Sequence, residues 1–221
     1  MDSSLTMVQT IAVWALPVIF AITLHEVAHG WVARYLGDGT AYKLGRLSLN
    51  PLRHVDPVGT VLIPGMLLAF GGGFLFGWAK PVPVDWRNFR KPRTDMALVA
   101  VAGPLSNLAM ALGWGLLFKF AIGTGAQDGI WYGLQLMGRA GILINISLMV
   151  LNLLPLPPLD GSRVLMGVLP PRAAFQYARI EPYGMLILIL LAVSSMLGKI
   201  LYWPFVLSFV GISHLLGINP A

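Results

Sequence analysis

The sequence predicts an all-α polytopic membrane protein, and three observations support this fold class. Of the 221 residues, 57% are hydrophobic and only 11% are charged, whereas soluble domains carry about 25% charged residues. The mean hydropathy is +0.75. Long apolar stretches follow one another along the whole chain, and there is no cysteine, which excludes disulfide frameworks, thiolate metal sites and thiol nucleophiles. We therefore expect residues 1–221 to form a single integral-membrane domain.

About four of the apolar stretches are predicted to cross the membrane. A spanning helix needs about 20 apolar residues. The stretches that reach or approach this length are Met7–Tyr35, Met96–Ile122, Gly138–Leu154 and Met185–Trp203. The tail Phe205–Leu216 is too short to span and follows Pro204, a favourable residue for opening a helix. We predict that this tail is a C-terminal interfacial helix.

The positions of lysine and arginine predict the orientation. Nine of the fifteen lie between Arg34 and Arg93, and the positive-inside rule places this part of the chain in the cytoplasm. The apolar stretch Val58–Gly77 begins and ends beside these basic residues and is interrupted by Pro64 and Gly71–Gly73. It is therefore predicted to be a re-entrant segment that enters and leaves on one side. The alternative is a further true span.

The first apolar stretch contains the motif H-E-x-x-H, formed by His25, Glu26 and His29. On a helix, residues four apart share a face, so both imidazoles can bind one metal ion while the glutamate lies beside it. Ionisable groups in an apolar helix are costly and are usually functional. The alternative is a pair of structural histidines near the membrane interface. A catalytic zinc ion would need a third protein ligand and an open position for water.

Asp160 is the candidate for that third ligand. It lies in the pattern Asn152–Gly161, at the inner end of the fourth apolar stretch. Taken alone, an aspartate before glycine indicates a turn that caps the next helix. If Val58–Gly77 is re-entrant, however, Asp160 lies at the same cytoplasmic face as the two histidines. If Val58–Gly77 spans, Asp160 lies about 30 Å of hydrocarbon away. The charge distribution and the ligand count therefore favour the same topology.

These motifs resemble those of the site-2 protease family of intramembrane zinc metalloproteases, in its short bacterial form. Besides the two patterns above, the shared motifs are Gly103-Pro104-Leu105-Ser106-Asn107, Asn50–Gly59 and Trp78–Val84. The resemblance extends from about Leu24 to Arg163, with no inserted PDZ-like stretch and no other appended domain. It implies that His25, His29 and Asp160 bind one zinc ion per chain and that Glu26 is the general base.

By this interpretation, the chain is an endopeptidase that hydrolyses a peptide bond of a membrane-embedded helix near the cytoplasmic face. Zinc would lower the pKa of its bound water toward about 7, and Glu26 would take the proton. The side-chain amides of Asn152 and Asn107 are candidate donors to the tetrahedral oxyanion. For both residues, the alternative is an interhelical hydrogen bond, which is also the role we expect for Asn145.

A helical substrate must be held unwound, because its peptide groups are already bonded to one another. Residues 40–50 alternate weakly between apolar and polar side chains. They are predicted to form either a short cytoplasmic β-hairpin, whose edge accepts the substrate, or a solvated loop. In the hairpin, Leu44, Leu47 and Leu49 would contact the substrate. His54 could orient the substrate or could be a structural loop histidine.

Two other classes of function fit part of the sequence. A catalytically silent homologue would keep the fold as a membrane binding protein, but all four candidate active-site residues are intact. A metal transporter would carry polar residues in both halves of the bilayer, whereas here they gather on one side. The formal net charge of +6 is too small for a nucleic-acid surface and suits basic loops beside an anionic leaflet. We expect a multi-pass plasma-membrane protein whose active site faces the cytoplasm and cleaves single-pass membrane proteins or signal-peptide remnants.

Overall fold

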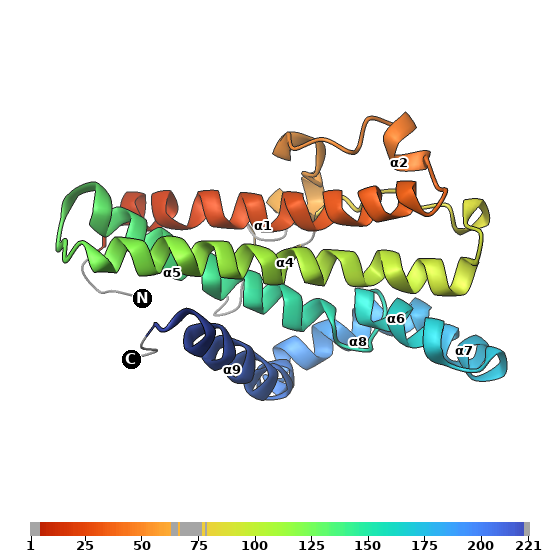
Figure 1. The fold of residues 1–221 in the computed structure, drawn as a ribbon. Helices are drawn as coiled ribbons and strands as arrows, with labels where there is room; N and C mark the ends of the chain where they lie inside the picture. Colours follow the sequence, from red (N-terminus) through yellow and green to blue (C-terminus); the bar gives the residue numbers. More distant parts are fainter. Residues whose placement is uncertain (1–4, 63–65, 67–76, 78, 219–221) are drawn as a thin grey trace.

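The computed structural model describes residues 5–62, 66, 77 and 79–218, and all regular structure in this part of the chain is helical (Figure 1). The long helices are α1 (Met7–Tyr35), α4 (Pro92–Gly123), α5 (Gly129–Asn152) and α9 (Met196–Leu216). The shorter helices are α2 (Thr40–Lys43), α6 (Asp160–Val168), α7 (Pro171–Ala178) and α8 (Glu181–Val193). Short 3-10 turns cover Pro51–Arg53 and Trp86–Asn88, and a π-helix covers Pro57–Leu62.

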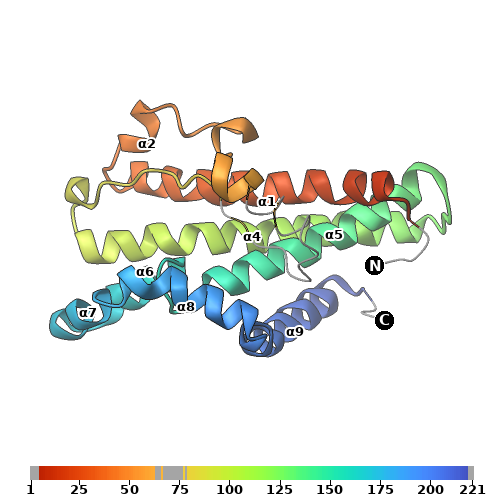
Figure 2. The same ribbon diagram turned by 180° about the vertical axis from the view of Figure 1, so that it is seen from behind.

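Helix α4 is the centre of the packing. It contacts α1, α5, α6 and α9, and the views from both sides show α1, α4 and α5 lying side by side (Figures 1 and 2). Small residues allow the close approach: a Cβ atom at Gly141 of α5 would lie 2.2 Å from Trp114 of α4, and one at Gly138 would lie 2.8 Å from Phe118. The buried apolar core between α4, α5 and α9 consists of Ala111, Ile142, Ile146, Met149, Val150 and Ile212.

Four helices are long and apolar enough to cross a membrane, namely α1, α4, α5 and α9. Helices α7 and α8 meet this criterion only as a pair and are bent by 61° relative to each other. The chain is therefore a multi-pass membrane protein, which confirms the predicted fold class. Helix α5 begins at Gly129, earlier than predicted, and the side-chain amide of Gln135 joins it to the preceding loop by donating to the carbonyls of Ala121 and Ala126.

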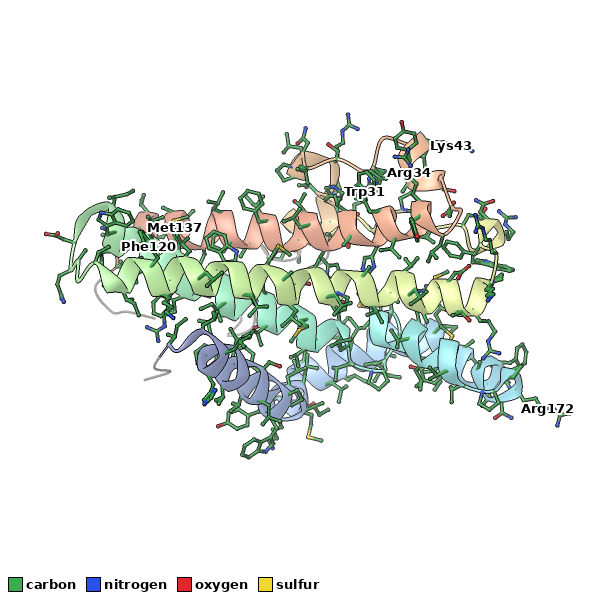
Figure 3. The ribbon with its side chains drawn as sticks, viewed as in Figure 1. Trp31, Arg34, Lys43, Phe120, Met137 and Arg172 are labelled. Carbon is green, nitrogen blue, oxygen red and sulfur yellow. The ribbon has the colours of Figure 1, made fainter. Side chains whose placement is uncertain are left out.

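Three basic side chains lie at one end of the molecule. Arg34 and Lys43 lie near the end of α1, and Arg172 lies on α7 at the same end of the molecule, whereas Phe120 and Met137 lie toward the other end (Figure 3). The guanidinium carbon of Arg34 lies 3.6 Å from the ring centroid of Tyr42. Such a cation–π contact, with an aromatic side chain beside a basic one, is typical of a membrane interface.

The C-terminal helices begin and end at different residues from those predicted. The predicted span Met185–Trp203 is interrupted at Ser195, which has a left-handed backbone conformation with φ 59°. Helix α9 then continues through Pro204, so the predicted interfacial helix Phe205–Leu216 is only the second half of a helix long enough to span. The prediction was wrong because it treated Pro204 as a helix start, although an apolar helix can contain a proline when neighbouring groups bond its freed carbonyls.

The predicted β-hairpin at residues 40–50 is also wrong, because the segment begins with the single helical turn α2 and none of its residues is in a strand. The Asp38 carboxylate caps this turn by accepting hydrogen bonds from the backbone N–H and the hydroxyl of Thr40. Local capping thus outweighed a weak alternation of side chains. The predicted re-entrant segment Val58–Gly77 falls mostly outside the described residues.

Candidate metal centre

The three predicted metal ligands converge in the structure. His25 and His29 lie one turn apart on α1, and Asp160 is the first residue of α6. The Oδ2 atom of Asp160 lies 3.2 Å from Nε2 of His25 and 3.3 Å from Nε2 of His29. The two Nε2 atoms lie 3.1 Å apart. Both histidines are buried and Asp160 is half-buried, so the three side chains form a group that could hold a metal ion.

The outer nitrogens of the two imidazoles determine which atoms face this centre. Nδ1 of His25 lies 2.5 Å from Oδ1 of Asn107, and Nδ1 of His29 lies 2.7 Å from the backbone oxygen of Val99. Because both partners are acceptors, each Nδ1 carries the hydrogen and each Nε2 presents a lone pair. Two lone pairs and a carboxylate oxygen therefore meet, an arrangement that is repulsive unless a cation lies among them. A shared proton would relieve only part of the repulsion.

The donor set fits zinc. In a tetrahedral zinc site with ligand distances of about 2.0–2.1 Å, the ligand atoms lie about 3.3 Å from one another. The observed separations of 3.1, 3.2 and 3.3 Å agree with this value. The Oδ2 atom of Asp160 is buried and makes no hydrogen bond within the described residues. Two imidazoles and one carboxylate would leave a fourth coordination position open, as in catalytic zinc sites.

Helix α4 supplies the surface on which the imidazoles pack. A Cβ atom at Gly103 would lie 2.4 Å from Nε2 of His29 and 2.6 Å from Cε1 of His25, so only glycine leaves room for both rings. Val99 and Asn107 lie one turn before and one turn after Gly103, and they hold the two Nδ1 atoms. The spacing of four residues on α4 thus matches the spacing of the two histidines on α1.

Helix α6 places Asp160. A Cβ atom at Gly161 would lie 2.2 Å from the backbone oxygen of Leu153, so glycine is required where the chain folds back on the end of α5. Further along α6, Gly167 packs directly on Ala97 of α4. The Arg93 guanidinium of α4 donates to backbone carbonyls at the end of α6. These contacts hold Asp160 toward α1.

The side chain of Glu26, the predicted general base, is hydrogen-bonded to a residue of the segment before α4. Its Oε2 atom accepts a hydrogen bond of 2.8 Å from the backbone N–H of Val82. Val82 lies between Pro81 and Pro83, which have no N–H to donate, in a segment without helical structure. The same segment lies against α1, because a Cβ atom at Gly30 would lie 3.0 Å from Val82.

The predicted substrate-binding residues lie in a segment without strands and differ in their surroundings. Leu44 and Leu49 are exposed, and Leu47 packs against Gly30 of α1. His54 is buried, with Nε2 at 2.9 Å from the backbone oxygen of Ser48, and its carbonyl accepts from the N–H of Lys80. This geometry favours the structural interpretation of His54.

The two candidate oxyanion donors differ in their surroundings. Asn152 donates to the carbonyl of Leu148 within α5 and is half-buried. Asn107 is fully buried, and its amide nitrogen donates to the carbonyl of Ala21 and to Oδ1 of Asn145. Both of its N–H hydrogens are therefore used, and this geometry does not support Asn107 as an oxyanion donor. The contact of Gly103 and Val99 with the histidines was not predicted, although the four-residue spacing on α4 matches that of the histidines on α1.

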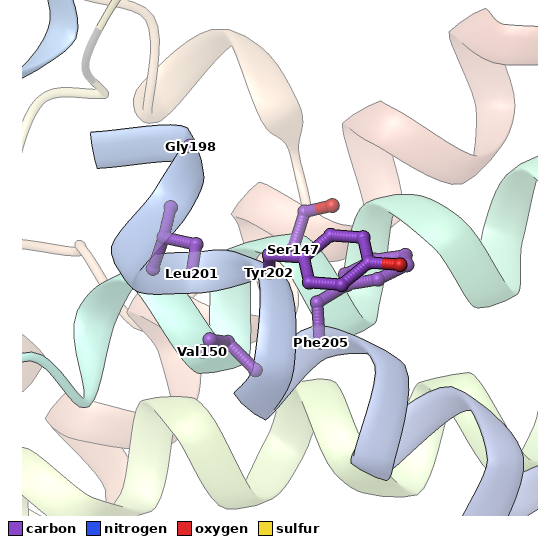
Figure 4. A pocket seen from close by; sticks show the side chains of 6 residues that line it. All are labelled: Ser147, Val150, Gly198, Leu201, Tyr202 and Phe205. Atoms are coloured by element: carbon purple, nitrogen blue, oxygen red, sulfur yellow. The ribbon is translucent and has the colours of Figure 1, made fainter. Parts of the chain in front are cut away.

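A cavity of about 230 Å³ lies between α5 and α9 (Figure 4). It is lined by Ser147, Val150, Gly198, Leu201, Tyr202 and Phe205. None of these residues belongs to the metal centre, and the lining is mostly apolar. We assign this cavity no part in the chemistry.

Comparisons with known proteins identify the family and relatives of this chain. The model of peptidase family M50 matches residues 123–195. The chain is 43% identical over 188 residues to "Putative zinc metalloprotease YwhC" of Bacillus subtilis, covering 84% of this chain and 82% of the relative. It is 31% identical over 204 residues to "Putative zinc metalloprotease Rip2" of Mycolicibacterium smegmatis, covering 90% and 74%. It is 31% identical over 215 residues to the Rip2 protein of Mycobacterium tuberculosis, covering 94% and 76%.

No solved structure gives a significant match to the chain. The alignments with the curated relatives nevertheless extend over most of both sequences. They confirm the resemblance to a family of zinc metalloproteases that the motifs indicated. The chain belongs to peptidase family M50.

Proposed function

We propose that this chain is an intramembrane zinc endopeptidase, with residues 1–221 acting as one catalytic domain. The observation that carries the proposal is the triangle of ligand atoms from His25, His29 and Asp160, at separations of 3.1–3.3 Å. These three residues would hold one zinc ion. When bound, zinc supplies Lewis-acid chemistry, because it polarises a peptide carbonyl and acidifies the attacking water. Membership in family M50 and the names of the relatives support this assignment.

Glu26 acts as the general base. The N–H of Val82 holds one carboxylate oxygen and so fixes the direction of the other. The carboxylate takes a proton from the attacking water and later gives it to the leaving amine. Because the centre lies among α1, α4 and α6, bulk water is largely excluded, which strengthens each electrostatic contact.

Asn152 is our candidate for the donor that stabilises the oxyanion. Its amide has one hydrogen beyond the one given to Leu148, and that hydrogen has no acceptor among the described residues. Asn152 ends α5, next to the turn that leads to Asp160, and the close contact between Leu153 and Gly161 brings this end of α5 to the start of α6. An amide donor there would stabilise charge that develops on the substrate carbonyl.

The substrate we propose is a membrane-embedded helix, either from a single-pass membrane protein or from a signal-peptide remnant, cleaved near the cytoplasmic face. Basic residues gather at the end of the long helices where Arg34 and Lys43 lie, which supports a cytoplasmic position for that end (Figure 3). The site lies on α1 within reach of this end, at His25 and His29. We propose a multi-pass plasma-membrane location, with this end of the helices in the cytoplasm.

The test combines zinc quantification with cleavage of a model transmembrane substrate in detergent, using the wild type, Glu26→Gln and Asp160→Ala. The wild type should bind about one zinc per chain and cleave. Glu26→Gln should keep zinc and lose about 10²–10⁴-fold in activity, because an amide cannot accept the proton. Asp160→Ala should lose both. Wild-type protein that binds zinc without cleaving would favour the silent-homologue alternative, and cleavage by Glu26→Gln at the wild-type rate would contradict hydrolysis at this site.

A further inference from the structure

Two asparagine side chains behind the metal centre are completely buried, one on α4 and one on α5. Both Asn107 and Asn145 have 0% exposure. Oδ1 of Asn107 accepts from Nδ1 of His25 at 2.5 Å, and its amide nitrogen donates to Oδ1 of Asn145 at 2.9 Å. The amide nitrogen of Asn145 donates to the carbonyl of Gly141 at 2.9 Å. A chain of hydrogen bonds therefore runs from α5 through α4 to a candidate ligand on α1.

The direction of each bond in this chain is determined by its far end. The carbonyl of Gly141 can only accept, so the nitrogen of Asn145 points toward it and the oxygen points toward Asn107. Two acceptors, Asn145 Oδ1 and the Ala21 carbonyl, then face the nitrogen of Asn107. The oxygen of Asn107 must therefore face His25. A flipped Asn107 amide would bring three oxygens together and leave buried groups unpaired, which is costly.

We propose that Asn107 and Asn145 are positioning residues for the metal centre. Asn107 fixes the ring orientation of His25 and the tautomer that presents Nε2, and Asn145 prevents the Asn107 amide from turning over. Neither amide touches the metal position or the substrate. This inference rests on the zinc site of the proposed function. It builds on the interhelical hydrogen bond that the sequence analysis left open for Asn107 and expected for Asn145, and adds the orientation of His25 to it.

The two histidines differ in what holds them. Nδ1 of His29 is bonded to a backbone carbonyl, that of Val99, which no substitution removes. Nδ1 of His25 depends on a side chain. The partner of a metal-bound histidine orients the ring and raises its basicity, and its loss typically weakens metal affinity by about 10- to 100-fold. Substitution of Asn107 should therefore act on the metal centre through His25 alone.

The experiment measures zinc affinity of the purified full-length chain by competition with a chelator, and the visible spectrum of the Co²⁺-substituted protein. Asn107→Leu has the same branching and number of side-chain heavy atoms but no acceptor, so it should bind zinc about 10- to 100-fold more weakly and alter the Co²⁺ spectrum. Asn107→Asp retains an oxygen toward His25 but turns its second oxygen toward two acceptors, so it should recover only part of the affinity lost in Asn107→Leu. Asn145→Leu should fall between Asn107→Leu and the wild type, because the Asn107 amide remains but is no longer anchored.

Ile146→Ala is the matched control. Ile146 is the next residue on α5, is equally buried, and belongs to the apolar core without any bond to the network. This variant should lower the melting temperature and leave zinc affinity and the Co²⁺ spectrum unchanged.

Wild-type zinc affinity in Asn107→Leu would overturn the proposal. The proposal would also be overturned if Ile146→Ala and Asn107→Leu lost equal stability and equal zinc affinity. The role of Asn107 would then be merely structural. Failure of the wild-type chain to bind zinc would instead contradict the proposed function.

Discussion

Gly103 carries no side chain at the point where α4 meets both candidate ligand histidines. Its Cα hydrogen faces the rings, and a Cβ atom there would overlap with both of them. Glycine costs a helix interior about 0.5–1 kcal/mol relative to alanine. Glycine nevertheless occurs in the middle of this 32-residue helix, because the imidazoles need the space that a side chain would fill.

Gly103→Ala should therefore weaken zinc binding by roughly 10-fold or more, since a metal site tolerates ligand displacements of only about 0.5 Å. Helix content should not fall, because alanine favours helix. Zinc titration and circular dichroism measure the two effects. The control is Gly113→Ala on the same helix, where a Cβ atom would meet nothing within 4 Å, and it should keep wild-type zinc affinity. Equal affinities in the two variants would contradict the role of Gly103.

Among the elements, the turn after α1 depends on one buried carboxylate. Asp38 has 0% exposure and joins α2 to the segment before α4, because it also accepts from the N–H of Asp85 and from the side-chain amide of Asn88. Burial opposes ionisation of the carboxyl. Hydrogen bonds from Thr40, Asn88 and Asp85 outweigh this effect and lower the pKa of Asp38 below its ordinary value of 3.8.

The sign of the pH dependence follows from this shift. Because the folded-state pKa lies below the unfolded-state pKa, the unfolded chain binds more protons in acid. The stabilisation is complete well above pH 3.8 and is lost as the pH falls through the folded-state pKa. Asp38→Asn should lower the melting temperature by roughly 5–10 °C at pH 7, and by progressively less below about pH 4. Thermal denaturation of both proteins across this range is the measurement, and a difference that stays constant with pH would contradict the assignment.

For the whole molecule, the metal centre depends on how α6 docks on α4. The candidate ligands lie far apart in the sequence. Helix α1 carries the two histidines, and α6 carries Asp160, with α4 and α5 between them along the chain. Glycine at position 167 allows this docking, because a Cβ atom there would lie 2.5 Å from Ala97 and 3.3 Å from the carbonyl of Arg93.

Gly167→Val should therefore push α6 away from α4 and weaken zinc binding through Asp160, although residue 167 lies two turns from that carboxylate. We expect a loss of affinity of about 10-fold, in line with the effects of residues that orient metal ligands. Gly211→Val on α9, where a Cβ atom would meet nothing within 4 Å, is the matched control and should bind zinc normally. Unchanged zinc affinity in Gly167→Val would show that α6 docking does not determine the position of Asp160.

The sequence alone determined the fold class and the residues proposed for the chemistry. Apolar composition and stretch length predict several membrane spans, and the spacing of His25 and His29 predicts two imidazoles on one helix face. These are local properties, because hydropathy and helical periodicity act within a single segment. A re-entrant Val58–Gly77 predicts that Asp160 lies at the same membrane face as the histidines, and the structure places the three together.

Tertiary structure decided which groups surround the ligands. Asn107 is one of two candidate amides in the sequence, and only the packing of α4 between α1 and α5 turns its oxygen toward His25 and its nitrogen toward Asn145. Likewise, the hydropathy pattern did not predict that the helix boundary lies at Ser195. It predicted a helix that begins after Pro204. The physical reason is that the contact face of a helix depends on how closely its neighbours can approach. Small residues such as Gly103 and Gly141 permit this approach. The approach depends on two helices that are distant in sequence, so the pattern within one segment does not predict it.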